Sequence, residues 1–359
     1  MLNTESDQLK RARDALESIL AAIPGAKLEW NTYARSDQPH LTQLADFTVT
    51  VNNDNIHRQD TLVVEFKSQG HPRQLREAID RLLRFRHRSN RPDYLVVAAP
   101  FITNEGAAVC QEEGVGYYDL AGNCRLIFGS YYVERSGQPN PVRKDQVNAS
   151  NLYGPKSERV LRVLFEDREW KVVPLAQHAN VSTGTVSIVR NLLLEREWAK
   201  DGPGGLKLTQ PKKLLTDWAE VWKRRRAKAK TYFTLKPLAE IEAEMAGFAA
   251  QHHAQFALTG AAGAWRVAPM TRYNRAQAYW GDDPGLLATG VGLKPVESGA
   301  NVHIFAPRDE GVFFAKEDVA GIPIVSPLQL YLDLQRDPAR GEEAAEHIWA
   351  TRLFPAHAG

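Results

Sequence analysis

Residues 174–208 read PLAQHANVSTGTVSIVRNLLLEREWAKDGPGGLKL, and this stretch decides the fold of the middle of the chain. Its first part predicts a short helix over Leu175–Ala179. Ser182 or Thr183 is then placed to begin a second helix that runs to about Glu195, because hydroxyl side chains cap helix N-termini. Two helices separated by so short a turn are typical of a helix-turn-helix.

The flanking residues extend this pattern on both sides. Upstream, Ser157–Phe165 has its apolar residues on one helical face and predicts another helix. Downstream, Trp198–Lys200 and Leu206–Leu208 read as short strands, and the glycine-rich segment Asp201–Gly205 lies between them as the tip of a hairpin. The sequence therefore predicts a winged helix-turn-helix at about residues 155–222.

The helix that begins at Ser182 or Thr183 separates apolar from polar residues. Val186, Val189, Leu192 and Leu193 are expected in the core, and the exposed start holds Ser182, Thr183, Thr185, Ser187, Arg190 and Asn191. Small hydroxyl side chains let a helix approach phosphates, whereas arginine and asparagine reach base edges in the major groove. Lys200 and Lys207 of the hairpin would lie beside the DNA backbone. We therefore predict binding to double-stranded DNA, with a winged helix used only for protein contact as the alternative.

A basic run follows the predicted winged helix. Six of the eight residues from Lys223 to Lys230 are basic, and the first four are expected to contact phosphates, namely Lys223, Arg224, Arg225 and Arg226. The alternative is that the run is a solvated helix end.

The N-terminal part alternates between helix and strand. Helices are predicted at about residues 6–22 and at Arg73–Arg86. Apolar runs that predict strands lie at Asp46–Val51, Thr61–Phe66, Tyr94–Ala99 and Arg125–Phe128. The pattern predicts an α/β domain with a mixed sheet and flanking helices.

Two of these strands carry a carboxylate–lysine set. Asp46 opens one strand, and after eighteen intervening residues Glu65 and Lys67 follow on one face of the next. Two carboxylates can hold Mg²⁺ or Mn²⁺, and a lysine can position a water that attacks a phosphodiester. A surface ion pair between Glu65 and Lys67 is the alternative.

The arrangement resembles the PD-(D/E)XK nuclease superfamily. The resemblance implies that Asp46, Glu65 and Lys67 form a catalytic triplet with Asp46 and Glu65 as metal ligands. Glu17, on the helix ahead of the strands, and Gln74, on the helix after them, would be accessory residues.

Composition sets the broad class. The chain has 359 residues, of which 43% are hydrophobic and 25% charged, so two or three folded domains are expected. The net charge of +2 makes any nucleic-acid argument depend on local clusters. The two cysteines, Cys110 and Cys124, are too few for a disulfide framework. With charges throughout the first 23 residues and no apolar run of membrane-spanning length, we expect a soluble cytoplasmic protein.

The polar stretch 136–152 predicts a linker. It divides the chain into an α/β domain at 1–135, a winged helix with its basic extension at 153–230 and an α+β domain at 231–359. In the last domain, Phe256–Ala262 and Gly321–Pro327 are similar to the first strand-turn and the closing helix of small nucleotidyltransferase folds. No aspartate pair follows at 265–279, so the resemblance implies a degenerate scaffold used for contact.

Three distinctive motifs lie at Val64–Ser68, Gly114–Asn123 and Ser326–Leu334. Together they resemble the AbiEi family of bacterial transcriptional regulators, the antitoxins of type IV toxin–antitoxin systems, and the similarity extends over about residues 60–350. The resemblance implies a regulator that binds its own promoter through the winged helix and counters a nucleotidyltransferase-type toxin. The better-described antitoxins carry the winged helix at the N-terminus, whereas here an α/β domain precedes it.

Three functions follow in order of preference. The first is a DNA-binding regulator of the antitoxin type, which could act as a monomer or as a homodimer. The second is a Mg²⁺-dependent DNA nuclease that the winged helix targets, in a mobile element or in phage defence. The third is a protein-interaction scaffold that does not bind DNA.

Overall fold

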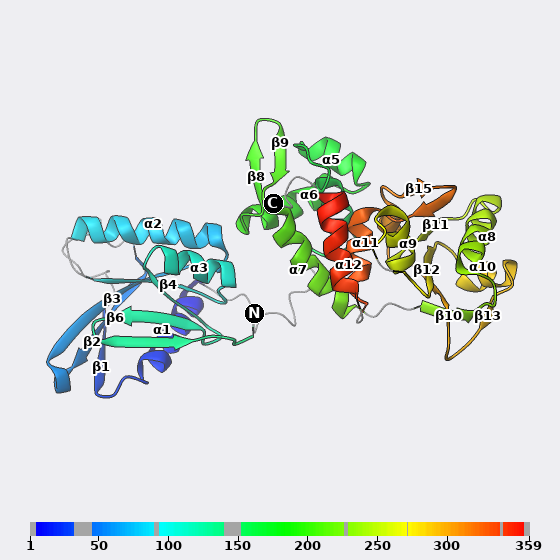
Figure 1. The fold of residues 1–359 in the computed structure, drawn as a ribbon. Helices are drawn as coiled ribbons and strands as arrows, with labels where there is room; N and C mark the ends of the chain where they lie inside the picture. Colours follow the sequence, from blue (N-terminus) through cyan, green and yellow to red (C-terminus); the bar gives the residue numbers. More distant parts are fainter. Residues whose placement is uncertain are drawn as a thin grey trace. The chain divides into compact units, whose positions relative to one another are not determined.

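The computed structural model describes residues 5–31, 45–89, 93–139, 152–225, 229–270, 272–337 and 340–354 (Figure 1). The chain forms two compact units. The first comprises residues 1–150 with 191–197, and the second comprises residues 151–190 with 198–359. Both contain helices and a mixed sheet, which confirms the predicted α/β class. Most of the predicted linker at 136–152 lies outside the described residues.

The first unit contains a seven-stranded sheet whose strands follow one another in sequence order. The central strands β3, β4 and β5 run parallel, and the outer neighbours pair antiparallel. The strands are β1 (Ala26–Asn31), β2 (Phe47–Asn53), β3 (Arg58–Phe66), β4 (Tyr94–Ala99), β5 (Gly116–Asp119), β6 (Cys124–Phe128) and β7 (Tyr131–Arg135). The helices are α1 (Glu5–Leu20), α2 (Pro72–Ser89) and α3 (Asn104–Glu112), with a short 3₁₀ helix, η2 (Asp54–Ile56).

Both faces of this sheet are buried, because successive side chains of a strand point to opposite sides. Val63 of β3 packs in one apolar cluster with Leu75 of α2. Its neighbour Val64 packs in the other cluster with Leu16 of α1. The sheet therefore lies between α1 on one face and α2 and α3 on the other (Figure 1).

The second unit begins with three helices and a hairpin. They are α4 (Pro155–Leu164), α5 (Val172–His178), α6 (Thr183–Glu195), β8 (Ala199–Gly202), β9 (Gly205–Leu208) and the longer helix α7 (Pro211–Arg224). The last turn of α6, from residue 191, is counted with the first unit. α5 begins at Val172, before the expected start at Leu175, because Pro174 falls in the first turn, where a proline is tolerated. Val160, Leu175, Val186 and Trp218 are fully or almost fully buried and belong to its core.

The rest of the second unit is a seven-stranded mixed sheet with helices. The strand order is β13 (Lys294–Pro295), β10 (Ala229–Phe233), β14 (Val302–Phe305), β12 (Ala276–Trp280), β11 (Phe256–Leu258), β16 (Ile322–Ile324) and β15 (Glu317–Val319). The helices are α8 (Leu238–Gln251), α9 (Gly260–Val267), α10 (Pro284–Gly290), η4 (Glu310–Phe313), α11 (Pro327–Leu334) and α12 (Gly341–Ile348), which continues as the π-helix η5 (Trp349–Leu353). Within the described part of the chain, no helix is long and apolar enough to span a membrane.

Candidate nucleic-acid interface and carboxylate–lysine site

The turn between α5 and α6 is fixed by local polar contacts. Asn180 has a left-handed backbone (φ 50°), which reverses the chain after α5. The Ser182 hydroxyl oxygen accepts a hydrogen bond from the Thr185 amide at 3.2 Å. Ser182 therefore caps α6, as one of the two expected residues.

One face of α6 is open to solvent. Ser182, Thr183, Ser187 and Asn191 are exposed, whereas Thr185 and Arg190 are half-buried. The opposite face places Val186, Val189 and Leu193 in the core, while Leu192 is only half-buried.

The exposed face of α6 also holds an apolar side chain that the sequence analysis did not select. Ile188 is 47% exposed and follows directly after Ser187. An aliphatic group at this position can contact a thymine methyl group in the major groove. The sequence does contain a signal for Ile188: it lies three residues before Asn191, which places both side chains on the same side of the helix.

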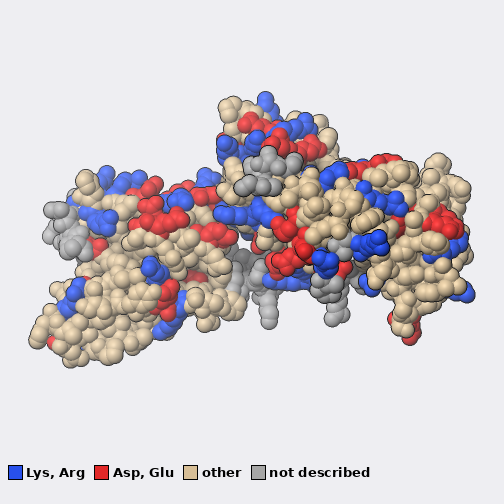
Figure 2. All heavy atoms as spheres, in the orientation of Figure 1, with Lys and Arg blue, Asp and Glu red and all other residues tan. Residues whose placement is uncertain are grey.

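The β8–β9 hairpin brings two lysines together. Lys200 and Lys207 are directly opposite each other in the antiparallel register. Like charges in this position destabilise a hairpin unless an anion lies nearby. Lys207 has an ion pair with Asp167 at 3.2 Å, and Lys200 is exposed. On the face drawn in Figure 2, basic side chains lie over this hairpin among acidic ones.

The tip of the hairpin is held against the segment before α5. Trp170 and Leu206 exchange two backbone hydrogen bonds, each of 2.9 Å. Gly205 has φ 121°, and a Cβ atom there would lie 2.2 Å from the Trp170 carbonyl oxygen. Only glycine satisfies both conditions.

Arg190 connects α6 to the hairpin. Its guanidinium forms a two-pronged ion pair with Asp201 of β8, with Nε 3.0 Å from Oδ1. Asp201 therefore holds Arg190 beside the hairpin, and this aspartate also adds a negative charge to the surface predicted to meet DNA.

The basic run after α7 does not form one surface. Arg225 binds the Glu158 carboxylate and the Tyr153 carbonyl oxygen, and its side chain is only 16% exposed. Because that guanidinium is used inside the unit, Arg225 is not available for the phosphate contact predicted from the sequence. Lys223 pairs with Glu220 at 3.0 Å, Arg224 is exposed, and Arg226 lies outside the described residues.

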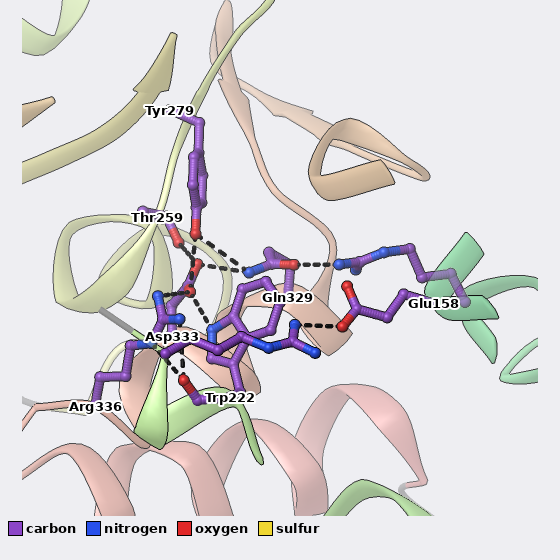
Figure 3. A network of polar contacts seen from close by, with 9 residues as sticks. Glu158, Trp222, Thr259, Tyr279, Gln329, Asp333 and Arg336 are labelled. Atoms are coloured by element: carbon purple, nitrogen blue, oxygen red, sulfur yellow. Dashed lines mark hydrogen bonds and ion pairs between the residues drawn. The ribbon is translucent and has the colours of Figure 1, made fainter. Parts of the chain in front are cut away.

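Arg225 belongs to a buried polar network that joins α4 and α7 to α11 (Figure 3). Asp333 of α11 accepts hydrogen bonds from the Trp222 indole at 2.9 Å, the Thr259 hydroxyl at 2.6 Å and the Tyr279 hydroxyl at 3.0 Å. Four residues earlier in the same helix, Gln329 donates to Asp333 at 2.9 Å.

The network continues into α4 through Arg162. Its guanidinium donates to the Gln329 side chain at 2.6 Å. Burial raises the pKa of Glu158 despite the opposing effect of Arg225, and burial lowers the pKa of Arg162. The sequence signal for this buried network was the pair of polar residues, Gln329 and Asp333, in an otherwise apolar helix.

The carboxylate–lysine set lies at the ends of β2 and β3. The Phe66 amide donates to the Asp46 carboxylate at 2.7 Å. Glu65 is almost fully buried, and its Oε1 atom lies 3.1 Å from Lys67 Nζ and 2.7 Å from Arg81 Nη1. Burial, and secondly Asp46, raise the pKa of Glu65 against the opposing effect of Lys67 and Arg81.

These residues fit a divalent cation only in part. Glu65 Oε2 is buried and has no hydrogen-bond partner among the described residues, so a cation would satisfy it. However, Lys67 and Arg81 already neutralise Glu65, and no group of three or more potential metal ligands occurs within the described ranges. Asp46 and Glu65 are the residues that would hold the metal.

The two residues predicted as accessory lie in different surroundings. The Gln74 side-chain oxygen accepts from the Gln69 amide at 3.2 Å and from the Ser68 hydroxyl at 3.5 Å, so it fixes the loop that follows Lys67. Glu17 lies on the exposed side of α1.

Comparison with known proteins identifies a regulator family for part of the chain. Residues 207–353 match the AbiEi_2 family, described as "Transcriptional regulator, AbiEi antitoxin, Type IV TA system". This match confirms the resemblance to AbiEi regulators from β9 to η5, a region that includes the motif Ser326–Leu334. The motifs Val64–Ser68 and Gly114–Asn123 lie outside the matched residues. No curated protein matches the chain.

A solved structure titled "Structure of EndoMS-dsDNA2 complex" is similar at 17% identity, over 33% of this chain and 44% of that one. The chain therefore spans less than half of that protein. The TM-score is 0.21, which is too low to transfer a fold.

Proposed function

We propose that the protein is a transcriptional regulator of the AbiEi antitoxin type that binds double-stranded DNA through α6 and the β8–β9 hairpin. The observation that carries the proposal is the polar exposed face of α6 beside a hairpin with two facing lysines. In this proposal α4 to β9 form a winged helix, and α6 is its recognition helix.

The contacts divide by chemistry. The hydroxyl groups at the start of α6, with Lys200 and Lys207, would bind phosphates. Asn191, Arg190 and Ile188 would face base edges. Lys223 and Arg224 would add phosphate contacts from the end of α7.

The family match supports the regulatory role because it covers α7 and all seven strands of the sheet that follows. We propose that residues 231–359 form a partner-binding domain, and that the partner is a nucleotidyltransferase-type toxin. The winged helix with its extension would occupy residues 153–230, and the linker 136–152 would separate it from the α/β domain. A homodimer remains a prediction.

Binding can be tested with a labelled duplex taken from the DNA upstream of the protein's own coding sequence. Fluorescence anisotropy at several salt concentrations measures both the affinity and its salt slope. Lys200→Ala is expected to reduce the slope by about 0.9, the value for one phosphate contact. Lys294→Ala, an exposed lysine of β13, is the matched control and is expected to leave it unchanged. Failure of the parent protein to bind this duplex at low salt would exclude the proposal.

A second function is supported by one observation, the buried Glu65 Oε2 atom that lacks a hydrogen-bond partner among the described residues. We propose as the alternative that residues 1–135 are a PD-(D/E)XK-like nuclease domain that acts with Mg²⁺ or Mn²⁺. Asp46 and Glu65 would bind the ion, whose positive charge would stabilise the negative charge on the phosphate. Lys67 would position the attacking water.

Supercoiled plasmid incubated with Mn²⁺ distinguishes the two functions. Nicking by the parent protein that is lost in both Glu65→Gln and Lys67→Ala would establish the nuclease. Equal nicking by the parent and both variants would indicate a contaminant. Absence of nicking, together with specific DNA binding, supports the regulator alone.

A further inference from the structure

A cavity of about 440 Å³ lies in the second unit. It is formed by α9, the segment before β12 and the region where α11 leads into α12. Its volume falls within the range of small-molecule sites, which is roughly 300–1,000 Å³. Neither the proposed DNA contacts nor the carboxylate–lysine site uses any residue of this cavity.

One wall of the cavity is apolar and shallow. Ala261 and Ala264 of α9 and Ala268, which follows that helix, contribute only methyl groups, and Trp265 of α9 is 36% exposed. A partly exposed tryptophan beside small residues offers a flat surface on which a planar ring can stack. The wall therefore suits an aromatic group rather than a flexible chain.

The lining of the cavity is also cationic. Arg272, Arg275 and Arg340 line it, and all three are exposed. Arg340 pairs with Glu343 at 3.0 Å, whereas Arg272 and Arg275 have no ion pair within the part of the chain that the structure describes. One acidic residue, Asp337, also lines the cavity and reduces its charge.

Two polar residues limit where a ligand can extend. The Tyr273 hydroxyl donates to buried Glu242 at 3.0 Å, so this side chain is fixed in the wall. Gln277 lies near the start of α9, and a Cβ atom at Gly260 would lie 2.2 Å from its oxygen. Gln277 therefore occupies the space beside Gly260 at the start of α9.

We propose that this cavity binds a mononucleotide, with the base against Trp265 and the phosphates at Arg272, Arg275 and Arg340. Arginine binds phosphate oxygens with two parallel hydrogen bonds, so these side chains suit the phosphates of a nucleotide. An inorganic phosphate would leave the tryptophan wall uncovered, and an uncharged aromatic molecule would leave the arginines unpaired. Only a ligand with both parts uses the whole cavity.

The proposal can be tested by calorimetric titration of the full chain with ATP in buffer that contains EDTA. Metal-free conditions keep ATP from binding through Asp46 and Glu65. Arg272→Ala and Arg275→Ala are each expected to weaken ATP binding about tenfold, the effect of losing one charge-assisted hydrogen-bonding group. Trp265→Ala is expected to weaken it by a similar factor. Arg308→Ala, an exposed arginine outside the cavity, is the matched control and is expected to change nothing.

Competition with tripolyphosphate and with adenosine tests the two halves of the ligand. Weaker binding of each than of ATP supports the proposal. Tripolyphosphate binding as tight as ATP would overturn it, because the base would then contribute nothing. No ATP binding at millimolar concentration, or equal losses in Arg272→Ala and Arg308→Ala, would also overturn it. Because Arg272 and Arg275 are exposed, these variants are expected to fold.

Discussion

The Arg225 guanidinium binds the buried carboxylate of Glu158 and so ties the end of α7 to α4. Because of this contact, Arg225 lies in the protein interior although it belongs to the basic run Lys223–Lys230. It also places α4 and α7 in one polar network with α11.

Replacing Arg225 with alanine is expected to destabilise the second unit strongly. Glu158 would stay buried without its partner, and breaking a buried pair in this way costs about 3–5 kcal/mol. Thermal unfolding followed by circular dichroism would show a clear fall in Tm. Arg224→Ala, at the exposed neighbouring position, is the control and should change the stability by less than about 0.5 kcal/mol. Similar effects of the two substitutions would contradict the assigned ion pair.

Replacing Asp201 with alanine is expected to strengthen DNA binding. The substitution removes a negative charge from the hairpin and releases Arg190 from its ion pair. The loss of repulsion between Asp201 and the DNA phosphates should lower the Kd most at low salt, because salt screens this repulsion. Anisotropy titrations across a salt series measure this change. Asp318→Ala, in β15, is the control, and weaker DNA binding by Asp201→Ala would show that holding Arg190 in place matters more than the charge.

Replacing Gly205 with alanine is expected to distort the hairpin tip. The residue has φ 121°, and the new methyl group would meet the Trp170 carbonyl at 2.2 Å. Such a backbone position costs roughly 1–3 kcal/mol in a residue other than glycine. Gly184→Ala in α6 is the control, because the nearest atom to its added methyl group lies 3.8 Å away. A lower Tm in Gly205→Ala alone would agree with the structure.

The buried Glu242 is expected to make stability fall as the pH rises. Burial raises the pKa of Glu242 above its usual 4.5, although Arg266 opposes this. A raised pKa in the folded state means that the folded protein holds the proton more tightly. The resulting stability is fully present below about pH 4.5 and is lost as the pH rises through the folded pKa.

Glu242→Gln removes this titration, so its Tm should decline less than that of the parent between pH 4.5 and pH 8. Glu244→Gln, on the same helix and partly exposed, is the control and should keep the decline of the parent. Parallel Tm curves for the parent and Glu242→Gln would contradict the raised pKa.

Local patterns determined the elements of the central region. The positions of α4 and α6, the β8–β9 hairpin and the capping role of Ser182 follow from residues close together in sequence, through helical periodicity, a capping hydroxyl group and glycine at a tight tip. The same holds for β2, β3 and β4, whose apolar residues predict buried strands.

Tertiary structure decided which polar side chains are available. Lys223–Lys230 reads as one basic surface, yet Arg225 lies inside because Glu158, 67 residues earlier, is buried opposite it. Glu65 and Lys67 were expected together, but Arg81 beside Glu65 could not be predicted, since α2 places it there only when it packs on the sheet.

The sequence by itself determined that a helix with small polar residues precedes a glycine-tipped hairpin, because periodicity, capping and turn formation act over a few residues. Only the tertiary structure decided that Arg190 pairs with Asp201, that Lys200 faces Lys207 and that Gln329 and Asp333 form a buried network with α4 and α7. The physical reason is that charges and hydrogen-bonding groups act on whatever lies within a few ångströms. Chain folding, rather than distance along the sequence, sets those neighbours.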